Sequence, residues 1–570
     1  MTQTKLRGFK GVDMPFTADQ KQGIAEQFLR ATQSANLPEN WTTDPEIIKL
    51  FLMFRSRAAD VIPSRIQLGG SLLKKASDAV DEETRKQVAG ENVLMSTDGW
   101  RSNAKDAIAG VQLNFKFQSL LASILRTNHW RKDGDSLALR FAEMIDTIEA
   151  DLGCNVIAFL TDNDGGSKRA RSVLVGKRPW LLVFPCVAHQ GQLLLGDLLK
   201  ECPEHSAVME ELVDFVHWVN SHDKVRDIFD NQQRRLLGKV LAFIAANLTR
   251  WTTHLVASIR FRVLKAPIRA AILNERDTII EGQVGAEANR RKREKLRDDA
   301  VAHCESVESN AWWDRLDAAI TDMEHVCYLT NIAQSDHVRP DQFLLALAGL
   351  YLHFHDHRNV GLGKRMCKRI EGRWKELDQS VFLVTLIFNP FEGLSRFGGR
   401  AKIDVFTVTT EVIKLFERMN QARPTETPRT PEQITAFDAV LKKRSLAIHK
   451  GAMLYLGQRG PFERWFEPGS VIKATYEDLH VPSSFAKIYG SCLFQDTNPV
   501  PFWEMLKTNA DVAELATFIE TLLYLVLTQA GLERSFSDFS NKKNKKRARL
   551  GIQKMAQQAK VTRAIRQEQY

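Results

Sequence analysis

Two apolar segments that each end in Thr-Asp constrain the fold of this chain more than any other feature of its sequence. Residues 93–98 read Val-Leu-Met-Ser-Thr-Asp, and residues 155–162 read Asn-Val-Ile-Ala-Phe-Leu-Thr-Asp. Short apolar runs of this length are typical of buried strands. Because each run ends in an acid, each predicted strand delivers a carboxylate to an edge of a sheet.

Further strands and helices are predicted around these two segments. They comprise strands at residues 108–115, 120–125 and 181–187, an apolar helical stripe from Leu137 to Ile148, a basic helix from about residue 167, and a helix over residues 190–200. The resulting order, β-β-β-α-β-α-β-α, predicts a mixed five-stranded sheet with helices on its faces.

The chain has 570 residues, which is more than one hydrophobic core usually holds. Few strand-like runs occur after residue 204, where most of the sequence has helical spacing. We therefore expect an α/β plus all-α protein in four parts. These are an N-terminal helical region (1–90), an α/β part (91–204), an all-helical part (205–505) and a C-terminal region (506–570).

Charge and cysteine usage narrow the class of protein. The net charge is +10 and the pI about 9.1, which favours a polyanionic partner such as nucleic acid. The seven cysteines form no Cys-x-x-Cys pair, a pattern typical of a reduced intracellular protein. The N-terminus has no apolar signal core, and the longest apolar span, residues 521–532, is too short to cross a bilayer. No membrane role is expected.

Asp98 and Asp162 are the first candidate site residues. If their strands are neighbours, both carboxylates emerge at the same sheet edge, where they repel each other unless a cation neutralises them. Mg²⁺, or Mn²⁺ in its place, suits oxygen ligands of this kind, and paired ions of this type promote substitution at phosphorus. The simpler alternative is that both acids only cap the loops that follow their strands.

Several short motifs then occur in a fixed order along the chain. They are Thr97-Asp98-Gly99-Trp100, Thr161-Asp162-Asn163, Cys186-x-x-His189, Thr249-Arg250-Trp251, and Glu533-Arg534-Ser535-Phe536-Ser537 followed by a Lys/Arg-rich stretch and Leu550. In this order and over about residues 15–570, the chain resembles the hAT superfamily of cut-and-paste DNA transposases.

This resemblance implies an RNase H-like core that a large all-helical insertion interrupts and that residues 506–570 complete, together with a dimerisation region. It implies that Asp98, Asp162 and Glu533 are the catalytic carboxylates and the ligands of Mg²⁺ or Mn²⁺. The implied activity is cleavage and strand transfer of DNA phosphodiesters. The implied partners are double-stranded DNA and further copies of the chain, in the nucleus, with no small-molecule cofactor.

The resemblance and the basic stretches also nominate DNA contacts. The candidates are His189, Arg250, Trp251, Arg534, Lys542, Lys543, Lys545, Lys546, Arg547 and Arg549. An indole such as that of Trp251 stacks on unpaired bases with about 1–3 kcal/mol per base, although the same residue also suits a core position. The basic stretch suits phosphate contact, a nuclear localisation signal or a solvated face, and its place directly after Glu533 makes phosphate contact a reasonable expectation.

The chain departs from the family in one respect, since it holds no Cys-x-x-Cys with spaced histidines of the kind found in the zinc finger of many members. Two functional classes therefore remain open. One is an active transposase; the other is a catalytically inactive, domesticated or decaying copy that acts as a dimeric DNA-binding nuclear protein.

Two clusters of residues whose side chains can bind metal ions are not expected to do so. Cys186 and His189 are too few for zinc. His353, His355, Asp356 and His357 are expected to form a solvated helix end, because no partner ligands are evident in the sequence.

Overall fold

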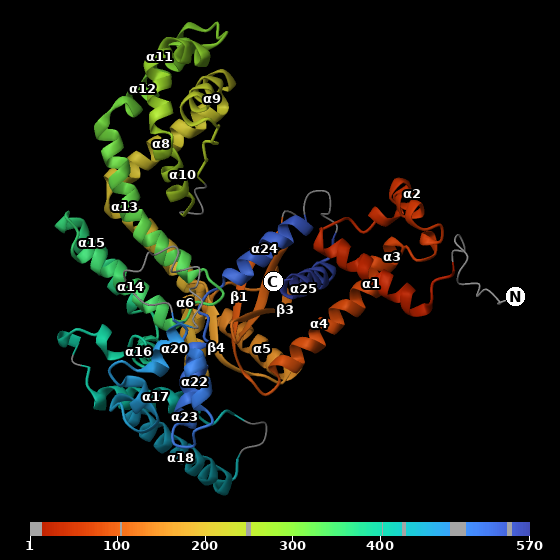
Figure 1. The fold of residues 1–570 in the computed structure, drawn as a ribbon, viewed down its shortest axis with the longest axis vertical. Helices are drawn as coiled ribbons and strands as arrows, with labels where there is room; N and C mark the ends of the chain where they lie inside the picture. The colour runs from red at the N-terminus through yellow and green to blue at the C-terminus, as the bar shows by residue number, and fades with distance from the viewer. Residues whose placement is uncertain are drawn as a thin grey trace, which may run out of the picture. The chain divides into compact units, whose positions relative to one another are not determined.

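The computed structural model describes residues 14–102, 105–246, 252–401, 403–424, 429–478, 497–543 and 550–569. The chain divides into two compact units, which are described separately below (Figure 1). The first unit combines Met1–Val183 with Gln529–Tyr570, and the second comprises Phe184–Thr528. The C-terminal segment of the chain therefore belongs with the N-terminal part, although hundreds of residues separate them in the sequence.

The first unit is built on a sheet with the strand order β3-β2-β1-β4-β5. The strands are β1 (Asn92–Arg101), β2 (Ala107–Phe115), β3 (Gln118–Arg126), β4 (Asn155–Thr161) and β5 (Leu182–Pro185), and the boundary between the units falls within β5. β1, β2 and β3 are antiparallel, whereas β4 runs parallel to β1. This topology confirms the predicted mixed five-stranded sheet and the α/β plus all-α fold class.

Helices cover both faces of this sheet. On one face, α5 (Gly134–Leu152) and α6 (Gly165–Lys177) follow the helical stripe expected from the sequence, with Phe141, Met144 and Ile148 buried against the strands. Because side chains alternate along a strand, Val93 and Met95 of β1 face this layer, and the even-numbered residues of β1 face the other. That second layer contains α24 (Ala530–Lys542) and α25 (Ile552–Gln569).

The N-terminal helices continue the first unit beside α25. They are α1 (Ala18–Ser34), α2 (Pro45–Phe54), α3 (Arg65–Gln67), which continues through a π-helical turn (Leu68–Leu72), and α4 (Leu73–Val88). Their shared core joins Leu29, Leu68 and Leu73 to Val561 and Ile565 of α25. The C-terminal helix is thus held by apolar contacts with the N-terminal region as well as with the sheet.

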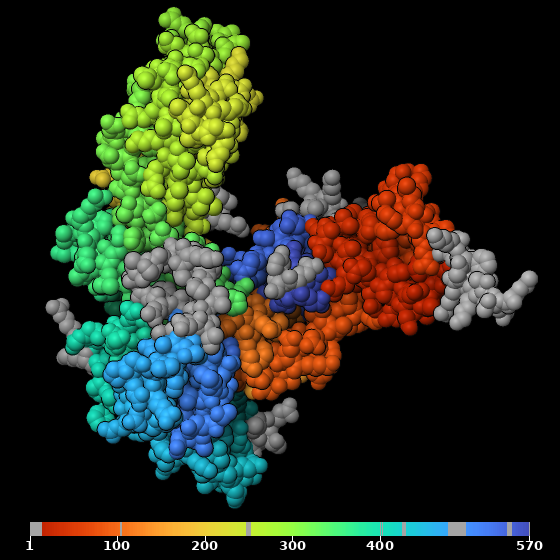
Figure 2. Space-filling model, in the orientation of Figure 1, coloured from red at the N-terminus to blue at the C-terminus, as the bar shows by residue number. Residues whose placement is uncertain are grey.

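The second unit is helical wherever the structure describes it, apart from the end of β5. Its helices are α7 (Val187–Glu201), α8 (Pro203–Ser221), α9 (Asp223–Leu237), α10 (Thr252–Val263), α11 (Lys265–Val284), α12 (Arg290–Glu308), α13 (Asn310–Ala333), α14 (Pro340–His355), α15 (Val360–Trp374), α16 (Gln379–Ile387), α17 (Val405–Met419), α18 (Pro431–Leu456), α19 (Glu463–Phe466), α20 (Val471–Asp478), α22 (Val500–Leu506) and α23 (Ala513–Leu523). Figure 2 shows α8 to α13, in yellow and green, packed side by side.

Aromatic side chains form much of the core between α8 and α13. Phe261 lies at the centre, with ring centroids 5.2 Å from Phe215 and 5.5 Å from Trp313. None of the helices in the described ranges combines the length and the apolar character that a membrane span needs.

Candidate active site at the sheet edge

Asp98 lies on the face of β1 that α24 covers, and its side chain is half-buried. Its Oδ1 accepts a hydrogen bond of 2.7 Å from the backbone N–H of Gly99. β1 does not end at this acid, as the sequence pattern predicted, but continues to Arg101 because it stays paired with β2 as far as Ala107.

The register between β1 and β4 brings Asp162 level with Asp98. Ser96 is paired with Leu160 across the parallel ladder, and each acid follows its paired residue by two positions. Parallel strands end at the same edge of a sheet, so both carboxylates emerge there together. β1 and β4 are therefore neighbours, which is the condition under which the sequence pattern brings both carboxylates to one sheet edge.

Arg171 of α6 holds the backbone around Asp162. Its Nη1 donates to the hydroxyl of Thr161 at 2.6 Å and to the carbonyl oxygen of Asp162 at 2.5 Å, and its Nη2 donates to Oδ1 of Asn163 at 2.5 Å. The guanidinium is buried, so these hydrogen bonds form away from bulk water and fix the loop after β4.

Sequence reasoning missed Arg171 as a site residue. It lies on the buried side of α6 with Ser167, Ala170 and Leu174, where helical spacing leads one to expect an apolar residue. A charged residue at a core position of an amphipathic helix was the available signal, because such a group requires hydrogen-bonding partners nearby.

α24 brings Glu533 to the same face of the sheet as Asp98. At the start of this helix, Nε2 of Gln529 donates a hydrogen bond to the backbone carbonyl of Thr97, the residue before Asp98. The side chains of Leu532 and Phe536 then pack on the sheet beside Ile108.

Two glycines lie where α24 packs closely against β2. A Cβ at Gly110, the β2 residue paired with Asp98, would lie 2.8 Å from Cδ2 of Leu532. A Cβ at Gly531 would lie 2.6 Å from Oε1 of Gln112 on the same strand. Real Cβ contacts are longer, so a larger residue at either position would require the side chain of Leu532 or Gln112 to move.

The charges of Asp162 and Glu533 both act on the carboxyl group of Asp98. The pKa of Asp98 is raised to about 8, first by burial and then by the negative charges of Asp162 and Glu533, while the hydrogen bond from Gly99 opposes the rise. Carboxylates placed in this way repel one another until a proton or a cation relieves them. The arrangement offers an all-oxygen donor set, which is the set that Mg²⁺ prefers.

The predicted DNA contacts fall into three groups. Arg534 is exposed on α24, next to Glu533, and His189 is half-buried in the first turn of α7, in the second unit. Arg250, Trp251, Lys545, Lys546, Arg547 and Arg549 lie outside the described residues.

Lys542 and Lys543 differ from the expected exposed basic stretch. Both are buried, and Nζ of Lys542 donates to the hydroxyl of Thr562 at 2.9 Å. Nζ of Lys543 pairs with Oδ2 of Asp106 at 2.7 Å. Both ammonium groups therefore bind partners within the chain, because the end of α24 faces the β1–β2 loop and α25 rather than solvent.

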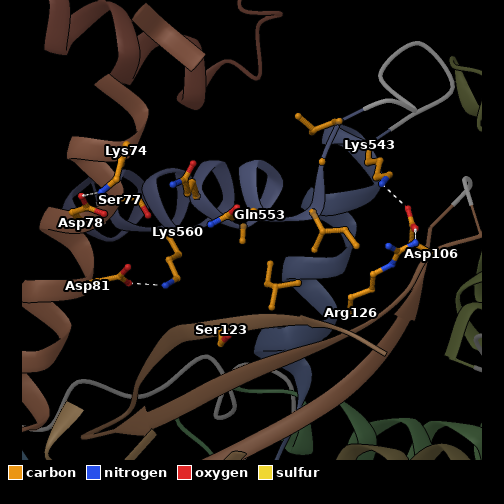
Figure 3. Close-up of a pocket in the computed structure, with 16 residues that line it drawn as sticks. Lys74, Ser77, Asp78, Asp81, Asp106, Ser123, Arg126, Lys543, Gln553 and Lys560 are labelled. Carbon is orange, nitrogen blue, oxygen red and sulfur yellow. Dashed lines mark hydrogen bonds and ion pairs between the residues drawn. The ribbon is translucent and has the colours of Figure 1, made fainter. Parts of the chain in front are cut away.

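A cavity of about 770 Å³ lies elsewhere in the first unit, between α4, β3 and α25 (Figure 3). Its charged side chains are already paired with one another: Lys74 with Asp78, Lys560 with Asp81, and both Lys543 and Arg126 with Asp106. The three acids at the sheet edge are not among its lining residues. We therefore assign the candidate chemistry to the acids and not to this cavity.

The histidines at the end of α14 do not form the solvated helix end expected from the sequence. Nε2 of His353 and Nε2 of His357 each lie 3.1 Å from Oδ1 of Asp322, on α13. The local sequence could not indicate Asp322 as their partner, because Asp322 comes from a different helix. His355, in contrast, is exposed and contacts Asp356.

One family model matches the chain, a domain of unknown function (DUF659), over residues 63–224. The match spans all five strands and includes Asp98 and Asp162, but it ends long before Glu533. A comparison with curated proteins found no match for the chain.

Proposed function

We propose that this chain is a hAT-like transposase, or a protein derived from one, that cleaves and joins DNA phosphodiesters with Asp98, Asp162 and Glu533. The strand order of the sheet is the one expected for an RNase H-like core. The domain family matched over residues 63–224 occurs in transposase-related proteins, which supports the same assignment.

The observation that carries this proposal is that the charges of Asp162 and Glu533 act on Asp98, although the three acids come from distant parts of the chain. Two come from adjacent strands and the third from a helix that follows a long helical insertion. Burying acids together is costly, and a folded protein retains such an arrangement where a ligand or a reaction uses it.

The donor set fits Mg²⁺ or Mn²⁺, and ions of this type activate an attacking oxygen and stabilise the leaving one at phosphorus. The chain's own residues would orient this site. Arg171 fixes the loop that carries Asp162, and Gln529 ties the start of α24 to Thr97 of β1, the residue before Asp98.

A second part of the proposal concerns partners. Double-stranded DNA is the substrate, a second copy of the chain is the partner of the C-terminal region, and the nucleus is the compartment. The net charge of +10 supports a polyanionic ligand. Of the nominated contacts within the described residues, Arg534 has the exposure and the position beside Glu533 that a phosphate contact requires.

A nicking assay on supercoiled plasmid DNA tests the proposal. The wild-type chain should nick the plasmid with Mg²⁺ and not with EDTA, and Asp162→Asn and Glu533→Gln should each lose activity by at least about two orders of magnitude. Asp538→Asn is the matched control, because Asp538 also lies on α24 but pairs with Arg566 of α25.

Equal activity in Glu533→Gln and wild type would refute the three-acid site. Absence of nicking in every protein, with DNA binding retained, would favour the alternative function of a catalytically inactive DNA-binding dimer.

A further inference from the structure

Asp322, His353 and His357 bring three metal-ligand atoms together inside the second unit. The donor atoms of these residues all lie within 4.8 Å of one another, a spacing that no other trio of ligand-type residues in the described ranges reaches. The carboxylate comes from α13, one imidazole from the last turn of α14 and the other from the turn that follows. Two helices that pack together thus contribute to one polar cluster.

The distances suit a tetrahedral metal ion. Nε2 of each histidine lies 3.1 Å from Oδ1 of Asp322. Ligand atoms bound at about 2.0–2.1 Å to a tetrahedral Zn²⁺ lie about 3.3 Å apart, close to the observed spacing. His357 lies beyond the end of α14, and the turn after the helix returns its imidazole to the same carboxylate oxygen that His353 contacts.

Neighbouring residues hydrogen-bond to the proposed ligands and orient them, as residues around a metal site do. Nε2 of His205, on α8, lies 2.9 Å from Oδ2 of Asp322, so the oxygen that does not face the other two histidines is also bound. Nδ1 of His357 faces the main chain of Asn359, with the backbone nitrogen 3.0 Å and the carbonyl oxygen 3.2 Å away, while Nε2 of the same ring faces Asp322. Such partners fix the orientation of metal ligands.

Backbone packing also fixes the turn that carries His357. A Cβ at Gly363, on α15, would lie 2.3 Å from the carbonyl oxygen of Phe354 and 3.3 Å from Cβ of His357. Glycine at this position lets α15 press against the turn. The imidazole of His357 is therefore held toward Asp322 by main-chain contacts as well as by its own hydrogen bond.

We propose that Asp322, His353 and His357 bind one Zn²⁺ ion, which links α13 to the end of α14 and stabilises the helical insertion. Two imidazoles and one carboxylate form a donor set that suits zinc, with water as a fourth ligand. His205 acts as a positioning residue through Oδ2 of Asp322. This site is independent of the three acids of the sheet edge, which belong to the first unit.

Zinc titration of the chelator-treated full-length chain tests this site. We expect one Zn²⁺ per chain by elemental analysis after gel filtration, and a higher melting temperature with zinc. Asp322→Asn and His357→Gln should lose the ion. His205→Gln should keep it with an affinity about 10–100-fold lower, as expected for an outer-layer partner.

His355→Gln is the matched control, because His355 lies between the two ligands but is 62% exposed and points to Asp356. It should bind zinc as the wild type does. Circular dichroism of each variant identifies any loss of binding that comes from unfolding, and X-ray absorption of the zinc-bound wild type should show nitrogen and oxygen ligands without sulfur.

Three results would overturn the proposal: no zinc bound by the folded wild type, zinc retained in both Asp322→Asn and His357→Gln, or sulfur among the ligands. Zinc that is retained in Asp322→Asn but lost in Asp162→Asn would place the ion at the sheet edge instead. That outcome would leave the proposed nuclease function standing, so the two proposals fail separately.

Discussion

Replacing Asp98 by Asn should stabilise the ion-free protein at alkaline pH and remove its response to Mg²⁺. In the folded chain, burial and then the charges of Asp162 and Glu533 raise the pKa of Asp98 from 3.8 to about 8. These influences are absent from the unfolded chain. Between the two pKa values the folded state holds a proton that the unfolded state has released, so the stability of the folded state falls as the pH rises.

The magnitude follows from the roughly four pKa units between the two states. Each pKa unit corresponds to about 1.4 kcal/mol. If the whole shift counted against stability, the free energy of unfolding would be lower by about 5–6 kcal/mol at pH 8 and above. The carboxyl is only half-buried, so water screens part of this cost, and we expect Asp98→Asn to recover about 2 kcal/mol there and almost nothing near pH 4. For a unit of this size that gain corresponds to about 4–8 °C in melting temperature.

Differential scanning calorimetry of the full-length chain measures this effect at acidic and alkaline pH, with EDTA and with excess Mg²⁺. In EDTA, the variant should melt above the wild type only at alkaline pH. Mg²⁺ should raise the melting temperature of the wild type but not that of Asp98→Asn. Asp151→Asn, which replaces an exposed acid of α5, is the control for the loss of one negative charge.

Two outcomes would refute the reasoning. If Asp98→Asn and Asp151→Asn shift the melting temperature equally at every pH, the folded state does not penalise the charge of Asp98. If Mg²⁺ stabilises Asp98→Asn as strongly as the wild type, Asp98 takes no part in binding the cation.

Three further predictions concern the contacts that build the first unit. Arg171→Met should lower the free energy of unfolding by about 2–4 kcal/mol in urea denaturation, because it removes three charge-assisted hydrogen bonds around Thr161 and Asp162; a change below about 0.5 kcal/mol would contradict this. Gly110→Ala places a Cβ against Leu532 and should cost about 1–3 kcal/mol while also lowering plasmid nicking; unchanged stability would show that α24 can shift freely. A hydrogen bond from Lys543 holds the pKa of Asp106 below its usual value, so this pair stabilises the fold above about pH 4 and the contribution is lost as the pH falls through the folded pKa; acid titration followed by circular dichroism should show a shallower loss of stability in Asp106→Asn than in wild type.

Local patterns in the sequence were sufficient for the sheet and for two of the three acids. Apolar runs and helical stripes depend on near neighbours in the chain, and the strands and helices that they predicted between residues 92 and 200 are present. Boundaries were less accurate. β1 extends past Asp98, and α5 begins at Gly134, capped by Asp133, ahead of the predicted stripe that starts at Leu137. These details depend on strand pairing and on backbone geometry rather than on periodicity.

The division into four parts (1–90, 91–204, 205–505 and 506–570) stays a prediction, and so do the DNA contacts, the dimer and the nuclear location. The buried positions of Lys542 and Lys543 show why a basic stretch is a weak signal. Composition records that the charges are present, but only the path of the chain decides whether an ammonium group faces solvent or an internal carboxylate.

By itself, the sequence determined which segments between residues 92 and 200 become strands and helices and that an acid follows the apolar run of two of these strands, because these properties follow from residues close together along the chain. Only the tertiary structure decided that α24 is seated against Gly110 so that Glu533 joins Asp98, that Arg171 turns inward to hold Asp162, and that Asp322 meets two histidines of another helix. These contacts join residues that are far apart along the chain, and their distances are set by how whole helices pack, which no local pattern encodes.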